Sequence, residues 1–272
     1  SGTYPSNPPY IPGTEGCGRV VEDPKGEIAP GTLVAWHAAP GSYAEQVAVD
    51  RNRLVAVPEG VDPAVAASML LQGMTSHYLL HGVRETKPGD TMVVTAGAGG
   101  VGLILTQMAA AEEATVYSVV SSDEKEKLAY EAGATKVFRY GEDLAEQIKA
   151  ENGGGGVDVV YDGVGQDTFE MCLNVTRPRG LVCSFGSASG DVEPFKIQEL
   201  NAHGALFLTR PSLKHYVATD DEFLMRAQAV ARAVEEGTVK IRIHPPYELK
   251  NARQAHEDLQ ARNTTGSVVL KV

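Results

Sequence analysis

The residues best suited to chemistry are a run of glycines, Ala96-Gly97-Ala98-Gly99-Gly100-Val101-Gly102. Glycines 97, 99 and 102 have the GxGxxG spacing, after an apolar run and before a helical pattern, which is the context in which this motif binds a dinucleotide. The missing side chains allow a tight turn, close approach of a pyrophosphate and close helix-to-strand packing. Free N–H groups at the helix start attract phosphate. No Lys-Ser or Lys-Thr follows, which argues against a nucleotide-hydrolysing P-loop.

The choice of dinucleotide depends on the residues that follow the second strand. NAD sites usually place an acid about 20 residues beyond the glycines, to bind the ribose hydroxyls. Here the strand ends at Ser121 and Ser122, with Lys125 one helical turn on. These three side chains could bind a 2′-phosphate, which favours NADPH, although the adjacent Asp123 leaves NADH open. Alternatively, Ser122 caps the helix, with Asp123 and Glu124 favourable in its first turn; both interpretations can hold at once.

Six apolar runs alternate with helical patterns and predict the element that positions these residues. The runs are residues 92–95, 115–120, 136–138, 157–161, 181–185 and 205–208, and a charged helix is expected over 123–132. Nearly continuous apolar strands indicate a parallel sheet covered on both faces. The predicted fold class is therefore α/β, with a doubly wound Rossmann sheet.

Composition divides the chain into three parts. Residues 1–63 are rich in Pro and Gly, with short β-type runs at 33–36 and 46–49, which predicts small antiparallel β structure. Residues 64–209 carry the Rossmann pattern. Residues 210–272 contain a long helix near 220–236 and expected strands at 239–243 and 267–272. We expect this tail to return to the N-terminal β domain.

Charge and composition exclude several classes of function. The formal net charge is −11, so we expect no nucleic-acid partner. No apolar segment approaches the roughly 20 residues of a membrane span, and no signal peptide is recognisable. Three widely spaced cysteines suit a reducing cytoplasm better than a disulfide framework. We find no convincing zinc-ligand spacing and predict no metal.

Eight segments, in order along nearly the whole chain, carry a resemblance to a known family. They are PYIPGTEGCGRV (9–20), LLQGMTSHYLL (70–80), KPGDTMVVTAGAGGVG (87–102), VSSDEKEKLAYEAGA (120–134), VVYDGVGQDTFE (159–170), RPRGLVCSFGSASG (177–190), LFLTRPSL (206–213) and ARNTTG (261–266). The chain resembles the zinc-free quinone oxidoreductases, the zeta-crystallin-like branch of the medium-chain dehydrogenases/reductases. The resemblance implies a GroES-like β domain beside a Rossmann domain, NADPH as hydride donor, quinones or activated alkenes as acceptors, and a homodimer, which we expect to join along the outer strand of the sheet near Leu206.

The resemblance also implies the cofactor-binding residues. Thr75 would lie near the nicotinamide carboxamide and Tyr78 on the cofactor side of the same helix. Tyr140 would lie near the 2′-phosphate or adenine ribose, and Val164 near the adenosine. The full set comprises Thr75, Tyr78, Gly99, Gly100, Val101, Ser121, Ser122, Lys125, Tyr140, Val164, Phe185, Gly186, Ser187, Phe207, Leu208, Thr209 and Arg262. Several of these residues also have a purely structural interpretation, without a ligand. Val164, Phe185 and Phe207 could be core residues, Tyr78 and Tyr140 half-buried tyrosines, and Arg262 a solvated surface charge.

The chain departs from the family pattern in three places. It begins late, so the first strands have no counterpart and we expect an incomplete β domain, retained NADPH binding and impaired turnover. Tyr4 would lie at the edge of the substrate pocket and is the candidate proton donor. Residues 109–114 lack the glycine that commonly ends the first helix, and Gly97 stands where alanine is common, a change we expect to be harmless. In keeping with a zinc-free enzyme, Thr14 stands where zinc-dependent relatives carry a histidine.

We therefore predict an enzyme, an NADPH-dependent quinone reductase that acts without metal. One alternative is a reductase of enoyl or other α,β-unsaturated carbonyl compounds on the same scaffold. Another is a non-catalytic NADPH-binding protein.

Overall fold

The computed structural model describes residues 8–261 and 263–272, and it divides into two compact units. Unit 1 comprises the chain up to Met74 together with Val217–Val272, and unit 2 comprises Thr75–Tyr216. Helix α1 (Pro63–Tyr78) contains the first boundary and continues into a wider π-helical turn, Leu79–Val83.

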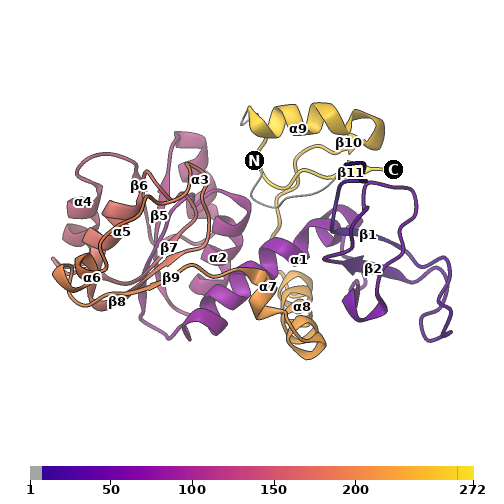
Figure 1. Ribbon diagram of the computed structural model, residues 1–272, viewed down its shortest axis with the longest axis horizontal. Coiled ribbons are helices and arrows are strands. Elements are labelled where there is room, and N and C mark those ends of the chain that lie inside the picture. The colour runs from indigo at the N-terminus through magenta and orange to yellow at the C-terminus, as the bar shows by residue number, and fades with distance from the viewer. Residues whose placement is uncertain (1–7, 262) are drawn as a thin grey trace. The chain divides into compact units, whose positions relative to one another are not determined.

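Unit 2 is built on a six-stranded parallel sheet with the strand order β6-β5-β4-β7-β8-β9 (Figure 1). Its strands are β4 (Thr91–Val94), β5 (Thr115–Val120), β6 (Lys136–Arg139), β7 (Val157–Asp162), β8 (Thr176–Ser184) and β9 (Phe207–Thr209). Its remaining helices are α2 (Gly100–Ala111), α3 (Asp123–Glu131), α4 (Leu144–Glu151), α5 (Phe169–Val175), α6 (Gln198–Ala202) and α7 (Leu213–Tyr216). The order reverses between β4 and β7, the position at which doubly wound sheets bind ligands. The predicted fold class is confirmed.

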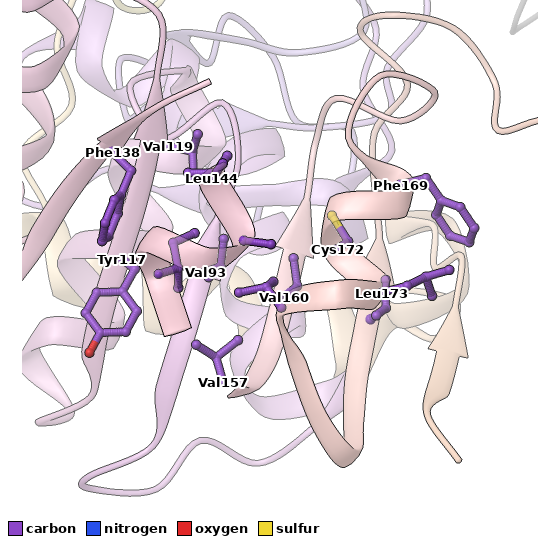
Figure 2. Close-up of a cluster of buried hydrophobic side chains, with 14 of the residues drawn as sticks. Val93, Tyr117, Val119, Phe138, Leu144, Val157, Val160, Phe169, Cys172 and Leu173 are labelled. Atoms are coloured by element: carbon purple, nitrogen blue, oxygen red, sulfur yellow. The ribbon is translucent and has the colours of Figure 1, made fainter. Parts of the chain in front are cut away.

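Apolar residues on both faces of the sheet explain why these strands are buried. Figure 2 shows the larger cluster, in which Val93, Val119 and Val160 meet residues of α4 and α5. On the opposite face Val120 and Val137 pack with Ala129 of α3. The sheet is therefore a rigid platform whose strands all end at one edge, where the loops carry most of the predicted binding residues.

Unit 1 contains the antiparallel sheet β1-β2-β3, with strands β1 (Gly16–Arg19), β2 (Leu33–Trp36) and β3 (Leu54–Ala56). It also contains α8 (Asp220–Glu235), α9 (Ala252–Gln260), the short parallel pair β10 (Tyr247–Glu248) and β11 (Leu270–Lys271), and two 3₁₀ turns, Arg51–Arg53 and Leu249–Asn251. Helix α8 begins at a capping box between Thr219 and Glu222, in which each side chain accepts from the other residue's amide.

The prediction of two strands in unit 1, over residues 46–49 and 239–243, is wrong. Residues 46–49 alternate in exposure as a strand would, but they pair with no strand among the described residues. Residues 239–243 contribute only an isolated bridge from Ile243 to Ser267. In both segments the side-chain pattern is present, but the neighbouring strand that would complete a hydrogen-bonded ladder is not among the described residues.

Candidate functional site at the carboxyl edge of the sheet

The glycine turn joins β4 to α2 at the point where the strand order reverses. Ala96 adopts a left-handed backbone conformation with φ 49°, and the amide of Gly99 donates to the carbonyl of Ala96 at 2.8 Å. Gly99 is the N-cap of α2, and the first intrahelical bond runs from Leu103 to Gly99. The amides of residues 100–102 thus belong to the helical turn that cannot satisfy its own donors.

The space around the glycines explains why these positions lack side chains. A Cβ on Gly102 would lie 2.5 Å from the carbonyl oxygen of Ala96, and a Cβ on Gly99 would lie 3.1 Å from the same atom. The turn therefore folds tightly onto the start of α2, and the first turn of the helix holds no acid. These features fit a diphosphate, because donors and a positive helix dipole are free of competing carboxylates.

The predicted 2′-phosphate residues lie together at the end of β5. The Lys125 ammonium donates to Ser121 Oγ at 3.1 Å. Ser122 is the N-cap of α3, and its hydroxyl accepts from the Lys125 amide at 3.4 Å. The capping role considered for Ser122 is therefore confirmed. The hydroxyl of Ser121 and the ammonium of Lys125 are placed so that both could meet one phosphate.

Tyr140 connects this region to the glycine turn. Its hydroxyl accepts from the amide of Ala96 at 2.8 Å and donates to the carbonyl of Val119 at 3.4 Å. Tyr140 as a whole is 38% exposed. Burial of the hydroxyl raises the pKa of Tyr140 to about 12, despite the hydrogen bond from Ala96, which lowers it. Tyr140 thus remains a neutral hydroxyl that fixes the first residue of the turn.

Asp162 organises the loop after β7 and was not anticipated from the sequence. The side chain is fully buried. Its Oδ1 accepts from the hydroxyls of Thr95 at 2.6 Å and Thr168 at 2.7 Å and from the Val164 amide at 3.2 Å, and its Oδ2 accepts from the Gly165 amide at 2.9 Å. A buried carboxylate with this many donors is well compensated. The signal in the sequence was an acid at the very end of an apolar strand.

The loop after β8 packs directly on the loop after β7. The amides of Phe185 and Gly186 both donate to the carbonyl of Asp162, at 2.8 and 3.1 Å. A Cβ on Gly186 would lie 2.5 Å from the carbonyl oxygen of Gly163. The half-buried Ser187 follows in the same loop, and its carbonyl accepts from Gly190. Predicted residues from two strands are thereby brought to one edge.

The three predicted binding residues of β9 differ in their exposure to solvent. Phe207 is 64% exposed on this edge strand, whereas Leu208 and Thr209 are half-buried. Leu208 and Thr209 line a cavity of about 490 Å³ together with Gly186 and Ser187. Arg210, which the sequence did not single out, donates to the carbonyl of Phe185 at 2.8 Å and links the two loops.

The predicted residues of α1 are buried. Thr75 is 8% exposed and Tyr78 is 2% exposed. The Tyr78 ring stacks on Tyr216 with ring centroids 4.4 Å apart and planes 9° from parallel. Packing therefore occupies much of the Tyr78 ring, and a cofactor contact for either residue stays a prediction. Tyr4 and Arg262 lie outside the residues that the structure describes.

Metal-ligating residues do not form a metal-binding group in the part of the chain that the structure describes. No group of three or more His, Cys, Asp or Glu residues there could hold a metal ion.

The three cysteines, Cys17, Cys172 and Cys183, are all unpaired, and burial raises the pKa of each thiol. No described helix is both long and apolar enough to cross a membrane.

Comparisons with known proteins identify the family. Residues 100–225 match the family model described as zinc-binding dehydrogenase. The chain is 38% identical to a quinone oxidoreductase of Pseudomonas aeruginosa, over 99% of this chain and 85% of that protein. The chain belongs to the quinone oxidoreductase family of the medium-chain dehydrogenases/reductases.

Two further similar proteins bear on the site. A 2-haloacrylate reductase from a Burkholderia species is 35% identical over 97% of this chain and 81% of that protein. The crystal structure of Escherichia coli quinone oxidoreductase complexed with NADPH superimposes with a TM-score of 0.94 at 36% identity, covering 100% of this chain and 85% of that one. Family membership thus agrees with the resemblance found in the sequence.

Proposed function

We propose that unit 2 binds NADPH across the carboxyl ends of its parallel strands and that the protein reduces quinones by hydride transfer. The observation that carries this proposal is the glycine turn before α2, in which a Cβ on Gly99 or Gly102 would meet the carbonyl oxygen of Ala96. This turn lies at the reversal of strand order in a chain of the quinone oxidoreductase family. NADPH supplies the hydride when it is bound. With one further proton, the quinone becomes a hydroquinone and the coenzyme is oxidised to NADP⁺.

The residues of the chain would divide the work of binding and orientation. The first amides of α2 would bind the diphosphate, and Ser121, Ser122 and Lys125 would bind the 2′-phosphate. Tyr140 and Val164 would border the adenosine. The loops after β8 and β9, with Thr75 and Tyr78, would border the nicotinamide and keep water from it. Tyr4 or water would supply the proton.

Two measurements on this chain test the proposal. Fluorescence titration should show saturable NADPH binding, and NADPH absorbance should fall when a benzoquinone is added. Gly99→Asp, which places a carboxylate at the start of α2, should abolish both signals. Saturable binding without turnover of any quinone would instead favour the non-catalytic alternative, and no binding would overturn the proposal.

A second candidate function is reduction of an activated alkene. It is favoured by the similarity to the 2-haloacrylate reductase. Both reactions use the same hydride, but an alkene conjugated to a carbonyl accepts it at carbon. Initial rates with a benzoquinone, a 2-haloacrylate and an α,β-unsaturated ketone, each at saturating NADPH, separate the two candidates, because the better substrate has the higher kcat/KM.

We also propose that two copies associate along β9. This strand is the edge of the sheet, and Phe207 exposes most of its ring there, a combination that favours pairing with another strand. Sedimentation velocity should show a dimer that Phe207→Lys weakens. A monomer at all concentrations would remove this proposal without affecting cofactor binding.

Two broader assignments remain proposals. The first is that residues 1–63 and 210–272 form a GroES-like substrate domain and residues 64–209 the cofactor domain. It is supported by the antiparallel sheet of unit 1 and the parallel sheet of unit 2.

The second proposal is a cytoplasmic location, which is supported by the three unpaired cysteines.

A further inference from the structure

The start of α3 presents an electrostatic problem for a coenzyme with a 2′-phosphate. Asp123, Glu124 and Glu126 all lie in the first turn of this helix, immediately after the residues proposed to bind that phosphate. A phosphate group carries nearly two negative charges near neutral pH. Carboxylates so close to it would repel it, and an acid in this region is the usual mark of a site for the unphosphorylated coenzyme.

Arg139 holds two of these three acids. It is the last residue of β6 and pairs in register with Val120, the residue before Ser121. Its Nη2 lies 2.7 Å from Oδ1 of Asp123 and 2.5 Å from Oε2 of Glu126. One guanidinium therefore bridges two carboxylates of the same helical turn.

The side chain of Arg139 lies against α3 and is 34% exposed. Residues of a strand alternate between its faces, so Arg139 lies on the same face as Val137, which packs on Ala129 of α3. The Nη1 atom of Arg139 is buried and has no hydrogen-bond partner among the described residues. The bridge to the two acids thus supplies the hydrogen bonds that hold this guanidinium.

Lys125 lies on α3, like the two acids held by Arg139, but its side chain contacts different groups. Its ammonium donates to Ser121 Oγ, whereas two acids of the first turn of α3 pair with Arg139 among the described residues. The two cations therefore have separate partners: Lys125 meets the hydroxyl of the proposed phosphate site, and Arg139 meets the acids beside it.

We propose that Arg139 determines the preference for NADPH over NADH: by holding the carboxylates of Asp123 and Glu126, it offsets the negative charge that would repel the 2′-phosphate. The inference rests on the proposed function of unit 2. Arg139 is then a positioning residue, because it acts on the phosphate through the acids. Asp123 is accommodated in an NADPH site because its charge is compensated from the neighbouring strand.

Arg139→Gln tests the inference against a matched control, Lys136→Gln. Lys136 is in the same strand three residues earlier and pairs with Glu151 at 3.7 Å, so its substitution removes the same charge roughly 10 Å away, about one Debye length at 0.1 M salt. Dissociation constants for NADPH and NADH are measured for both variants by fluorescence titration.

We expect Arg139→Gln to raise the Kd for NADPH by about five- to tenfold and that for NADH by less than about twofold, because one nearby surface charge is worth up to about one power of ten in affinity. Lys136→Gln should change neither value by more than about twofold. The NADPH effect should shrink as salt is added. A merely structural role for Arg139 would weaken both coenzymes equally.

Charge removal on the helix supplies the decisive variant. Adding Asp123→Asn and Glu126→Gln to Arg139→Gln should restore NADPH affinity to within about twofold of the parent, because the repelling carboxylates are then gone. Failure of this rescue, or equal losses for NADPH and NADH, would overturn the inference while leaving the proposed function intact. Absence of NADPH binding by the parent chain would overturn both.

Discussion

Two parts of the carboxyl edge of the sheet in unit 2 differ in the groups that form them. The glycine turn and the loop after β7 consist of backbone groups and a fully buried Asp162, packed so closely that added atoms have no room. The end of β5 and the start of α3 consist of exposed side chains: Ser121 accepts a hydrogen bond from Lys125, and Asp123 forms an ion pair with Arg139. We infer that recognition of the diphosphate is geometric and all-or-none, whereas recognition of the 2′-phosphate is electrostatic and graded.

The largest expected effect comes from filling the turn with Gly102→Ala. The new Cβ would lie 2.5 Å from the Ala96 carbonyl oxygen and 2.8 Å from that of Gly97. Because both obstacles are backbone, the helix must move away from the turn. We expect a loss of about 3 kcal/mol in the free energy of unfolding, measured in urea, near the upper end for overpacking. NADPH and NADH binding should be lost together.

Gly141→Ala is the matched control, since a Cβ on Gly141 meets nothing within 4 Å. It should leave stability within about 0.5 kcal/mol of the parent. Equal behaviour of the two variants would show that close packing is not what the turn requires.

Asp162→Asn should have the next largest effect. An amide can accept through only one of its two terminal atoms, so its NH₂ group must face a donor that Asp162 now satisfies, such as the Gly165 amide or the hydroxyl of Thr168. The unfolding free energy should fall by about 2–3 kcal/mol, the cost of a buried unsatisfied donor plus a lost charged hydrogen bond. The exposed Asp167 offers the control Asp167→Asn, and an equally small effect of both would contradict the role given to Asp162.

Gly97→Ala should have a smaller effect that depends on one neighbour. Its Cβ would lie 2.4 Å from Ser118 Oγ, an atom that is buried and has no hydrogen-bond partner among the described residues. We expect a loss of about 2 kcal/mol, because the buried Ser118 leaves no space for the alanine that is common in the family. In a Ser118→Gly background the same change should cost less than about 0.5 kcal/mol, so a double-mutant cycle from urea unfolding should give strong coupling. Additive losses would disprove the clash.

The features that could be predicted from the sequence are those that depend on residues close together along the chain. The strands of unit 2 were recognisable because both faces are apolar, and the cap at Ser122 because capping depends on residues three positions apart. The bond from Thr95 to Asp162 joins residues 67 positions apart, and the bridge from Arg139 to Asp123 crosses between a strand and a helix. Such contacts are set by packing. The roles of Asp162 and Arg139 were therefore not predictable from motifs, and the segment 46–49 had a strand pattern without a described partner.

Tyr140→Phe should give the smallest effect, because Tyr140 lies where the two parts of the edge meet. Its loss leaves the Ala96 amide and the Val119 carbonyl without this partner, at a net cost of about 1 kcal/mol in unfolding free energy. With a pKa of about 12, the hydroxyl of Tyr140 is neutral over the whole working range. The affinity of the parent for NADPH should therefore show no titration from this group between about pH 6 and pH 9, and the ratio of the NADPH affinities of Tyr140→Phe and the parent should be constant there. If that ratio varied with pH, Tyr140 would have to ionise near the phosphate, and the hydroxyl would be a charged part of the graded site instead of a fixed support for the turn.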